Sequence, residues 1–223
     1  MAERVVVITG ATGGLGRVAA RAFAEHGHSL ALLSTDQKKL VDLAQSLELP
    51  PGRLYTQAVN VLHAGALQSA DESVAARFGE VHVLIHLIGG WAGGKTLPET
   101  DPQQLEAMFA QHGRSTFNLI KAFVPQLVRS GWGRVLAVSP ISASRPPGMN
   151  GAYAAAKSGQ ETLLLTLAEE FKGRGLTANV LQVRSIDAEH TGDGTTPEDL
   201  AAAMLYLCSD EAGKINGARI PLV

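Results

Sequence analysis

The sequence is poor in cysteine and in long apolar runs, and each shortage excludes a class of protein. Its 223 residues include one cysteine, Cys208, so no disulfide can form within one molecule, and a reducing compartment is expected. No apolar run approaches the ~20 residues that cross a bilayer. The run near the N-terminus is too short for a secretory signal. We therefore expect a cytoplasmic protein with no membrane partner.

Basic clusters and metal-ligand clusters are also missing. The 19 Lys and Arg residues nearly balance the 21 Asp and Glu residues, for a net charge of −2, and no basic run suits a nucleic acid. The seven histidines lack the spacing of metal sites. Ser139 lacks the G-x-S-x-G context of a hydrolase nucleophile, and Cys208 is expected in the core. A small-molecule partner remains.

Short apolar runs alternate with longer segments of helical periodicity. The alternation predicts βαβ units, with about seven parallel strands, about six helices on both faces of the sheet, and one domain over residues 1–223. The expected strands, the last two of them weaker, are Arg4–Thr9, Ser29–Ser34, Val81–Ile88, Gly133–Ser139, Thr177–Val183, Arg53–Val59 and Ala218–Val223.

Two long segments are predicted to be helices. From Leu105 to Leu127, apolar residues recur at steps of three and four, and Phe109 and His112 belong to this stripe, which is expected to face inward. Residues 151–171 form the second segment.

A glycine-rich turn follows the first expected strand. Residues 9–16 read T-G-A-T-G-G-L-G and lead into a helical segment. Glycine permits a tight turn and close backbone approach, and the free N–H groups of the following helix suit a pyrophosphate. This order predicts a doubly wound Rossmann-type domain that binds a dinucleotide. The expected cofactor contacts here are Gly10, Thr12, Gly13, Gly14, Leu15 and Gly16.

Tyr153 and Lys157 lie four residues apart and project from one face of the second helix. Together with T-G-x-x-x-G-x-G at residues 9–16, Y-A-A-A-K at 153–157 resembles the two signatures of the short-chain dehydrogenase/reductase family over essentially the whole chain. The resemblance implies hydride transfer from NAD or NADP, with Tyr153 as proton donor. Lys157 would hold the cofactor ribose and lower the pKa of Tyr153.

Several positions depart from the family pattern. Pro140 stands thirteen residues before Tyr153, where the family has a serine that polarises the substrate oxygen, and proline has no donor. Ser139 and Ser142 are the candidate substitutes. Ser142 would point to the same side as position 140 if the strand that ends near Ser139 continues. His112 replaces an asparagine of the long helix and is read as a hydrogen-bonded core histidine.

Two further departures border the expected cleft. Ile88 and Gly89 belong to H-L-I-G, where the family usually has Asn-Asn-Ala-Gly, and they are expected to contact the cofactor. Arg184 follows Val183 where a Pro-Gly pair is usual. It can meet an acidic substrate, meet a cofactor phosphate, or remain solvated.

One local likeness suggests a substrate. Residues 89–94 and 147–149 resemble dihydropteridine reductases, which also lack the serine. Trp91 is then expected beside a flat substrate, with Pro140 next to it, although Trp91 can equally pack in its loop.

The end of the second strand bears on the cofactor. Ser34 replaces the acidic residue that selects NAD, and Thr35 follows it. Both can donate to a 2′-phosphate, which slightly favours NADP, whereas Asp36 turned inward would favour NAD. Asn60 and Val61 are expected at the adenine.

Two functions remain open. The first is an NAD(P)-dependent reductase of a small carbonyl or quinonoid compound, with a pterin-like compound as one option. The alternative is a degenerate member that binds NAD(P) in a regulatory or scaffolding role. The family implies a homo-oligomer, a dimer or a tetramer, through residues 105–127 and 151–171. Residues 184–196 are polar and predict a shortened lid over an open site.

Overall fold

The computed structural model describes residues 3–222, which form one seven-stranded parallel sheet in the order β3-β2-β1-β4-β5-β6-β7. The predicted parallel sheet is confirmed, strand by strand and within a few residues; Val223 lies outside the described residues. The strands are β1 Val5–Thr9, β2 Ser29–Ser34, β3 Leu54–Ala58, β4 Val83–His86, β5 Gly133–Pro140, β6 Leu176–Val183 and β7 Arg219–Leu222.

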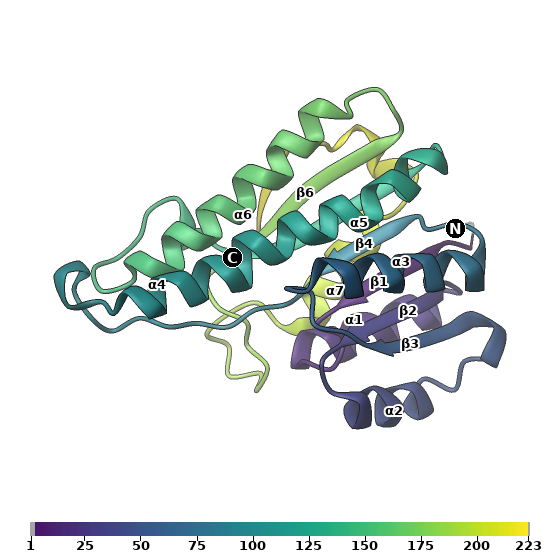
Figure 1. The fold of residues 1–223 in the computed structure, drawn as a ribbon, viewed down its shortest axis with the longest axis horizontal. Helices are drawn as coiled ribbons and strands as arrows, with labels where there is room; N and C mark the ends of the chain where they lie inside the picture. The colour runs from purple at the N-terminus through teal and green to yellow at the C-terminus, as the bar shows by residue number, and fades with distance from the viewer. Residues whose placement is uncertain (1–2, 223) are drawn as a thin grey trace.

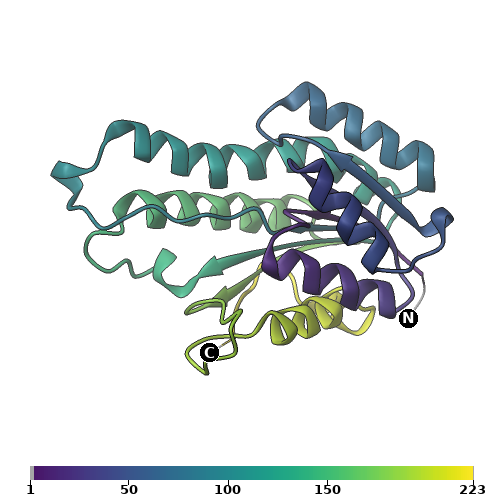
Figure 2. The ribbon, with the colours of Figure 1, turned by 90° about the horizontal axis from the view of Figure 1, so that it is seen from below.

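Helices cover both faces of the sheet, as Figures 1 and 2 show. The α-helices are α1 Gly14–Glu25, α2 Gln37–Ser46, α3 Ala64–Phe78, α4 Pro102–Met108, α5 Ser115–Arg129, α6 Gly151–Glu170 and α7 Pro197–Leu207. Helices α1, α2 and α7 share one apolar core with the sheet, and α3, α5 and α6 share the other. The layers therefore match a doubly wound α/β fold.

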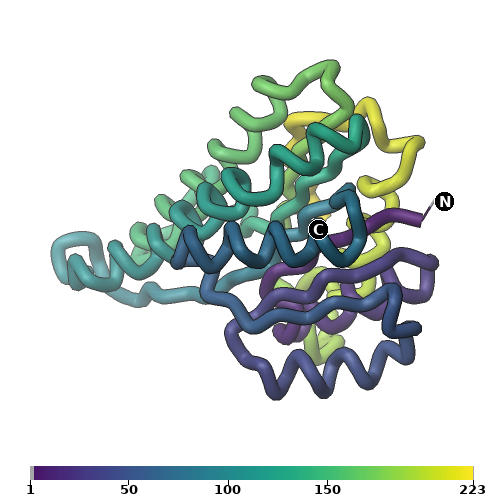
Figure 3. The backbone as a smooth tube through the Cα atoms, turned by 45° about the vertical axis from the view of Figure 1, so that its right-hand side comes forward, coloured from purple at the N-terminus to yellow at the C-terminus, as the bar shows by residue number. Residues whose placement is uncertain are grey.

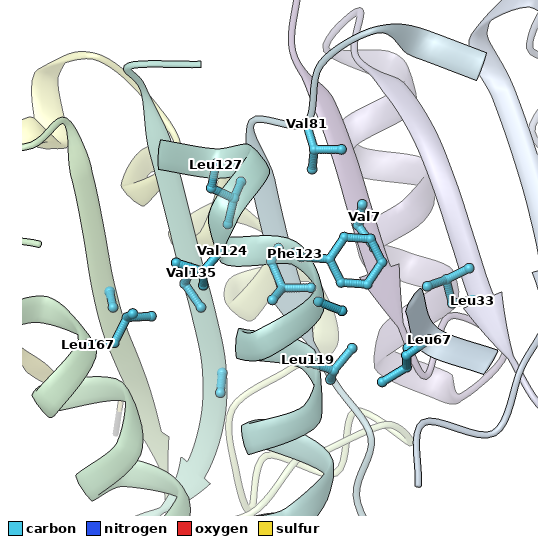
Figure 4. Packing of buried hydrophobic residues seen from close by; sticks show 14 of the residues in the cluster. Val7, Leu33, Leu67, Val81, Leu119, Phe123, Val124, Leu127, Val135 and Leu167 are labelled. Carbon is cyan, nitrogen blue, oxygen red and sulfur yellow. The ribbon is translucent and has the colours of Figure 1, made fainter. Parts of the chain in front are cut away.

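The two cores follow from the alternation of side chains along each strand. In β1, Val5 and Val7 face α3 and α5, whereas Val6 and Ile8 face α1. Phe123 of α5 is fully buried over Val7, as the close-up in Figure 4 shows. Because the sheet is covered on both faces, its strands are apolar at nearly every position.

A π-helix interrupts the long helix that the sequence predicts. Residues Phe109–Arg114 join α4 to α5, and the N–H of Ser115 bonds to the carbonyl of Ala110, five residues back. The wider turn changes the rotation of the helix relative to a regular 3.6-residue repeat. The expectation of one inward stripe from Leu105 is therefore wrong at its start: Leu105 and Phe109 are 40% and 43% exposed.

The helices α4, α5 and α6 run beyond the carboxyl ends of the strands, which the arrowheads in Figure 2 mark, and the tube in Figure 3 shows the same extension of the chain from a third side. The chain passes from β1 to β2 in one direction across the sheet and to β4 in the other. Such a reversal leaves a crevice outside the carboxyl ends of the strands, where open α/β sheets bind ligands. The fold thus places the glycine turn after β1 and the residues after β4 beside one another.

Candidate functional site

The glycine turn is held so closely that two of its glycines admit no side chain. A Cβ on Gly16 would lie 2.3 Å from the carbonyl oxygen of Gly10. Gly10 itself has φ of +71°, and a Cβ there would lie 2.8 Å from the backbone of Leu87. At Gly14, the first residue of α1, a Cβ would meet nothing within 4 Å. The turn therefore leaves an open space over the N-terminus of α1.

One cavity of about 490 Å³ extends from the glycine turn across the ends of β2 and β3. Of the predicted cofactor residues, it is lined by Gly10, Thr12, Gly13, Ser34, Thr35, Asn60, Val61, Ile88 and Gly89. The hydroxyl oxygens of Thr12 and Ser34 are 2.6 Å apart. Asp36 caps α2 instead, where its Oδ1 accepts the N–H of Lys39 at 3.0 Å. No carboxylate lines this cavity within the part of the chain that the structure describes.

A second cavity, of about 460 Å³, adjoins the first and extends over β4, β5 and β6. It brings together the remaining predicted residues, which are Gly14, Leu15, Gly16, Trp91, Ser139, Pro140, Tyr153 and Lys157. Ser142 is the exception. The strand ends at Pro140, the residues Ile141–Ala143 form a 3₁₀ turn, and Ser142 does not line the cleft. The condition under which Ser142 could replace the usual serine, a strand that continues past position 140, is therefore not met.

Lys157 is almost fully buried, and its ammonium is turned toward the protein. Its Nζ donates to the carbonyl of Val138 at 2.9 Å and to Oε1 of Gln160 at 2.8 Å. Burial lowers the pKa of Lys157 to about 8, and the charge of Glu161 opposes this shift. Tyr153 differs from the sequence expectation, because burial raises its pKa. In this arrangement Tyr153 is protonated at neutral pH.

Ser139 is a buried hydroxyl at the floor of the cleft. Its side chain is 1% exposed, and its Oγ has no hydrogen-bond partner among the described residues. A buried hydroxyl without a partner is costly, and such exceptions occur at sites that meet a ligand. The neighbouring Pro140 pairs with Val183 across the sheet and has no donor of its own. Ser139 is thus the available hydroxyl donor beside the position of the usual serine.

Two buried histidines lie on the protein side of the cleft. Nε2 of His112 lies 3.0 Å from the carbonyl of Gly90, so this nitrogen carries the proton and Nδ1 is a bare acceptor. The His112 ring packs edge-on against Tyr153, with ring centroids 5.4 Å apart. Burial lowers the pKa of His112 to about 4 and that of His86 to about 3, and the charge of Lys157 adds to both shifts. Both imidazoles are therefore neutral near pH 7, as expected for a core histidine at 112.

The rim of the cleft is formed by two loops. The Trp91 side chain is 64% exposed, and its Nε1 donates to Oδ1 of Asn150 at 2.9 Å. Arg184 is exposed and lines the cleft at the start of the loop 184–196. This loop contains no helix, and it is closed by a bridge between Ile186 and Thr195. The rim thus offers an indole and a guanidinium.

The structure adds site residues that the sequence reasoning missed. Besides Leu87, whose backbone approaches Gly10, they are Gln111, Ser115, Ser185 and Ile186 in the cavity walls and Gln160 behind Lys157. Gln160 had a readable signal, since it follows Lys157 by three residues and shares its helix face. The others come from loops or from the π-helix, and no periodicity marks them.

The residues present fit a nicotinamide dinucleotide. The two cavities share Gly10, Gly13, Leu87, Ile88 and Gly89, so they form one elongated cleft. Each lies within the usual range of about 300–1,000 Å³ for ligand sites. Where they join, the glycines leave free space at the N-terminus of α1, which suits the pyrophosphate. Within residues 3–222 no group of His, Cys, Asp and Glu could hold a metal ion, and no helix could span a membrane.

Comparison with known proteins agrees with this geometry. A family model described as short chain dehydrogenase matches residues 4–199. D-threitol dehydrogenase of Mycolicibacterium smegmatis is 28% identical over 233 residues, covering 96% of this chain and 89% of that protein. A short chain dehydrogenase from Bacillus anthracis has a crystal structure that matches with a TM-score of 0.89 at 25% identity, covering 98% of this chain and 94% of the other. The chain therefore belongs to the short-chain dehydrogenase family and is an NAD(P)-dependent oxidoreductase.

Proposed function

We propose that the chain reduces a small carbonyl or quinonoid compound, with Tyr153 as the proton donor and Lys157 as its partner. The observation that carries the proposal is that Tyr153 and the buried Lys157 line the same cleft as the glycine turn. When bound, the reduced nicotinamide supplies a hydride. The protein then has to supply one proton and to hold the developing oxyanion.

The side chains of the cleft can perform these two tasks. Tyr153 carries its proton at neutral pH because burial raises its pKa, so it can donate to a substrate oxygen. The Lys157 ammonium would stabilise the phenolate that remains. The unpaired Oγ of Ser139 would donate to the same oxygen in place of the serine that Pro140 replaces.

The substrate end favours a flat molecule. The Trp91 indole is held at its nitrogen by Asn150 and is mostly exposed, which supports a role in stacking on a substrate ring. A quinonoid substrate such as a pterin presents a flat ring, and its reduction needs a hydride and one proton more than it needs carbonyl polarisation. The short, helix-free loop 184–196 would leave this end open.

The other end of the cleft supports NADP over NAD. Ser34 and Thr35 line the cavity where an acidic residue would select NAD, and Thr12 adds a third hydroxyl. Asp36 is held at the N-terminus of α2 and away from this wall. A 2′-phosphate would thus meet three hydroxyl groups and no carboxylate.

The test is a search for turnover with NADPH and NADH against a panel of quinonoid pterins, quinones and activated carbonyls, read by the absorbance of the reduced cofactor. Tyr153→Phe should lower turnover by about 100-fold or more while cofactor binding, measured by thermal shift, is kept. Tyr206→Phe, on the exposed face of α7, is the matched control. Tight cofactor binding with no turnover across the panel would favour the regulatory or scaffolding role.

We also propose that two copies of the chain pair through α4, α5 and α6. A groove of about 1030 Å³ lies between these helices, and Phe109 and Phe117 are exposed beside it at 43% and 54%. A dimer or tetramer would bury this apolar surface. Phe117→Glu should shift the mass in solution toward the monomer.

A cytoplasmic location stays a prediction.

A further inference from the structure

A buried amide lies directly behind Lys157. Gln160 is one turn further along α6, and its side chain is 1% exposed. Its Oε1 accepts from Lys157 Nζ at 2.8 Å, and its Nε2 donates to Oγ1 of Thr116 at 3.0 Å. Both polar ends of the amide are therefore satisfied in the interior, which is the condition for burying it at low cost.

The direction of these hydrogen bonds is fixed from the other end. The Thr116 hydroxyl donates to the backbone carbonyl of His112 at 2.6 Å, and a carbonyl can only accept. The Thr116 oxygen is then free to accept, so it faces the NH₂ group of Gln160. The amide oxygen must in consequence face Lys157. A directed chain of hydrogen bonds thus links the π-helix that carries His112 to the lysine.

The chain also determines where the lysine ammonium points. An ammonium has three N–H groups in a tetrahedral arrangement. One is taken by the Val138 carbonyl and a second by Gln160, both on the protein side. Two fixed acceptors set the rotation of the group, so the third N–H has one remaining direction, and Lys157 lines the cleft.

We propose that Gln160 is a positioning residue for Lys157, which aims the third N–H of the ammonium into the cleft and favours its protonated form. The proposal rests on the proposed function, since it assigns a role to Gln160 through Lys157. Thr116 and the π-helix in turn hold the amide in place. The role goes beyond the Tyr153 and Lys157 pair, because neither of these residues fixes the rotation of the ammonium.

Among the groups around Lys157, the side-chain acceptor of its ammonium is the uncharged Gln160 on the same helix. Glu161 follows on α6, but both of its carboxylate oxygens are used, one by Arg219 at 2.5 Å and one by Gln182 at 3.1 Å. From the other elements His86 of β4 and His112 of the π-helix face the lysine, and both are neutral near pH 7. Substitution at Gln160 therefore changes the proton affinity of Lys157 with little other rearrangement of charge.

The test compares Gln160→Met with Gln160→Glu. Methionine has similar length and no strong acceptor, so the pKa of Lys157 should fall by about one unit, given the usual strength of a hydrogen bond to a charged group. Glutamate adds a negative charge and should move the pKa upward. The alkaline limb of the kcat profile should shift in the same two opposite directions, with KM for the cofactor changing less than kcat.

The lysine can also be followed without turnover. In protein labelled with ¹³C at the lysine ε carbon, the resonance that disappears in Lys157→Arg reports its titration. Opposite shifts in Met and Glu variants support the positioning role, even if no substrate of the panel is reduced. An unchanged titration in both variants overturns the role of Gln160, whereas normal shifts with no turnover contradict only the proposed reaction.

A second variant guards against misfolding. In Gln160→Met the Thr116 oxygen loses the N–H group that donates to it. The double variant Gln160→Met with Thr116→Val removes both side chains of this hydrogen bond and keeps their volumes similar. The double variant should melt closer to the wild type and still show the lowered titration of Lys157. Recovery of the wild-type titration in the double variant would overturn the proposal.

Discussion

The two halves of the cleft are built by different means. Over β1, β2 and β3 the walls are backbone, glycine and small hydroxyl groups, and the usual family pattern of the glycine turn is kept. Over β4, β5 and β6 the walls carry Tyr153, Lys157 and His86, and His112 packs behind Tyr153. The tyrosine and lysine match the family pattern, whereas His86, His112 and Pro140 depart from it. The first half depends on space, and the second depends on where protons are held.

This difference shows which changes each half tolerates. A backbone cradle is insensitive to the identity of neighbouring side chains and sensitive to any added Cβ. A buried polar network behaves in the opposite way, since each member needs its partner. Pro140 can therefore replace a serine in the second half without any effect on the glycine turn.

The largest effect is expected at Gly16. In Gly16→Ala the new Cβ would lie 2.3 Å from the Gly10 carbonyl, so the turn must shift, at a cost of about 3 kcal/mol or more in the free energy of unfolding. Gly14→Ala is the matched control, because its Cβ meets no atom within 4 Å, and alanine suits the first turn of α1. Gly14→Ala should be at least as stable as the wild type in urea unfolding, yet bind the cofactor more weakly. Equal stability of the two variants would contradict the close backbone packing of the glycine turn around Gly16.

The next effect concerns the buried His112. Its pKa is about 4 in the folded protein, below the usual 6.5, so the unfolded chain binds more protons as the pH falls below 6.5. The free energy of unfolding therefore falls as the pH decreases from 6.5 to about 4, because protonation of His112 favours the unfolded chain. At pH 5 the loss is about 2 kcal/mol. In His112→Asn the fall in unfolding free energy from pH 7 to pH 5 should be smaller by about that amount.

The matched control for this experiment is His63→Asn, which removes an exposed histidine. An equal pH dependence in the wild type and in His112→Asn would show that His112 binds a proton as readily in the folded protein as in the unfolded chain. Burial would then not hold this imidazole neutral below pH 6.5.

A smaller effect is expected at Ser34, in the first half. Ser34→Asp places a carboxylate at the end of β2, where it would repel a 2′-phosphate and accept from a 2′-hydroxyl. The ratio of NADPH to NADH affinity, measured by fluorescence titration, should fall by about tenfold, or about 1.4 kcal/mol. Asp36→Asn keeps the cap of α2 and should leave the ratio unchanged. A ratio that responds to Asp36 and not to Ser34 would reverse the proposed selection of NADP.

The smallest effect is expected at Arg184. Among the described residues this exposed guanidinium has no carboxylate within 4 Å, and the charged residues that line its cavity are Lys157 and Arg184. We expect a carboxylate-bearing carbonyl to be preferred over its methyl ester, and Arg184→Gln to lower that preference by up to about fivefold in KM. Arg145→Gln, at an exposed position that does not line the cleft, is the control. A change in NADPH affinity alone would assign Arg184 to the cofactor phosphate.

The glycine turn and the strands were predictable because their signals are local. A run such as Val5–Thr9 followed by glycines needs no distant partner to be read. The rotation of the long helix was not predictable from periodicity. The Ser115 and Thr116 hydroxyls donate to the carbonyls of Gln111 and His112, one turn earlier, and such bonds accompany bends and altered turns in helices. That local change exposes Phe109 and places His112 against Tyr153.

The sequence alone was sufficient to predict the doubly wound fold, the glycine turn that follows β1 and the four-residue spacing of Tyr153 and Lys157, because each signal lies in residues close together along the chain. Tertiary structure alone decided the proton states in the cleft. Burial raises the pKa of Tyr153 where the nearby lysine was expected to lower it, and the ammonium of Lys157 is turned to Val138 and Gln160. Desolvation and hydrogen-bond direction depend on neighbours from three or more elements, and no spacing in the sequence encodes them.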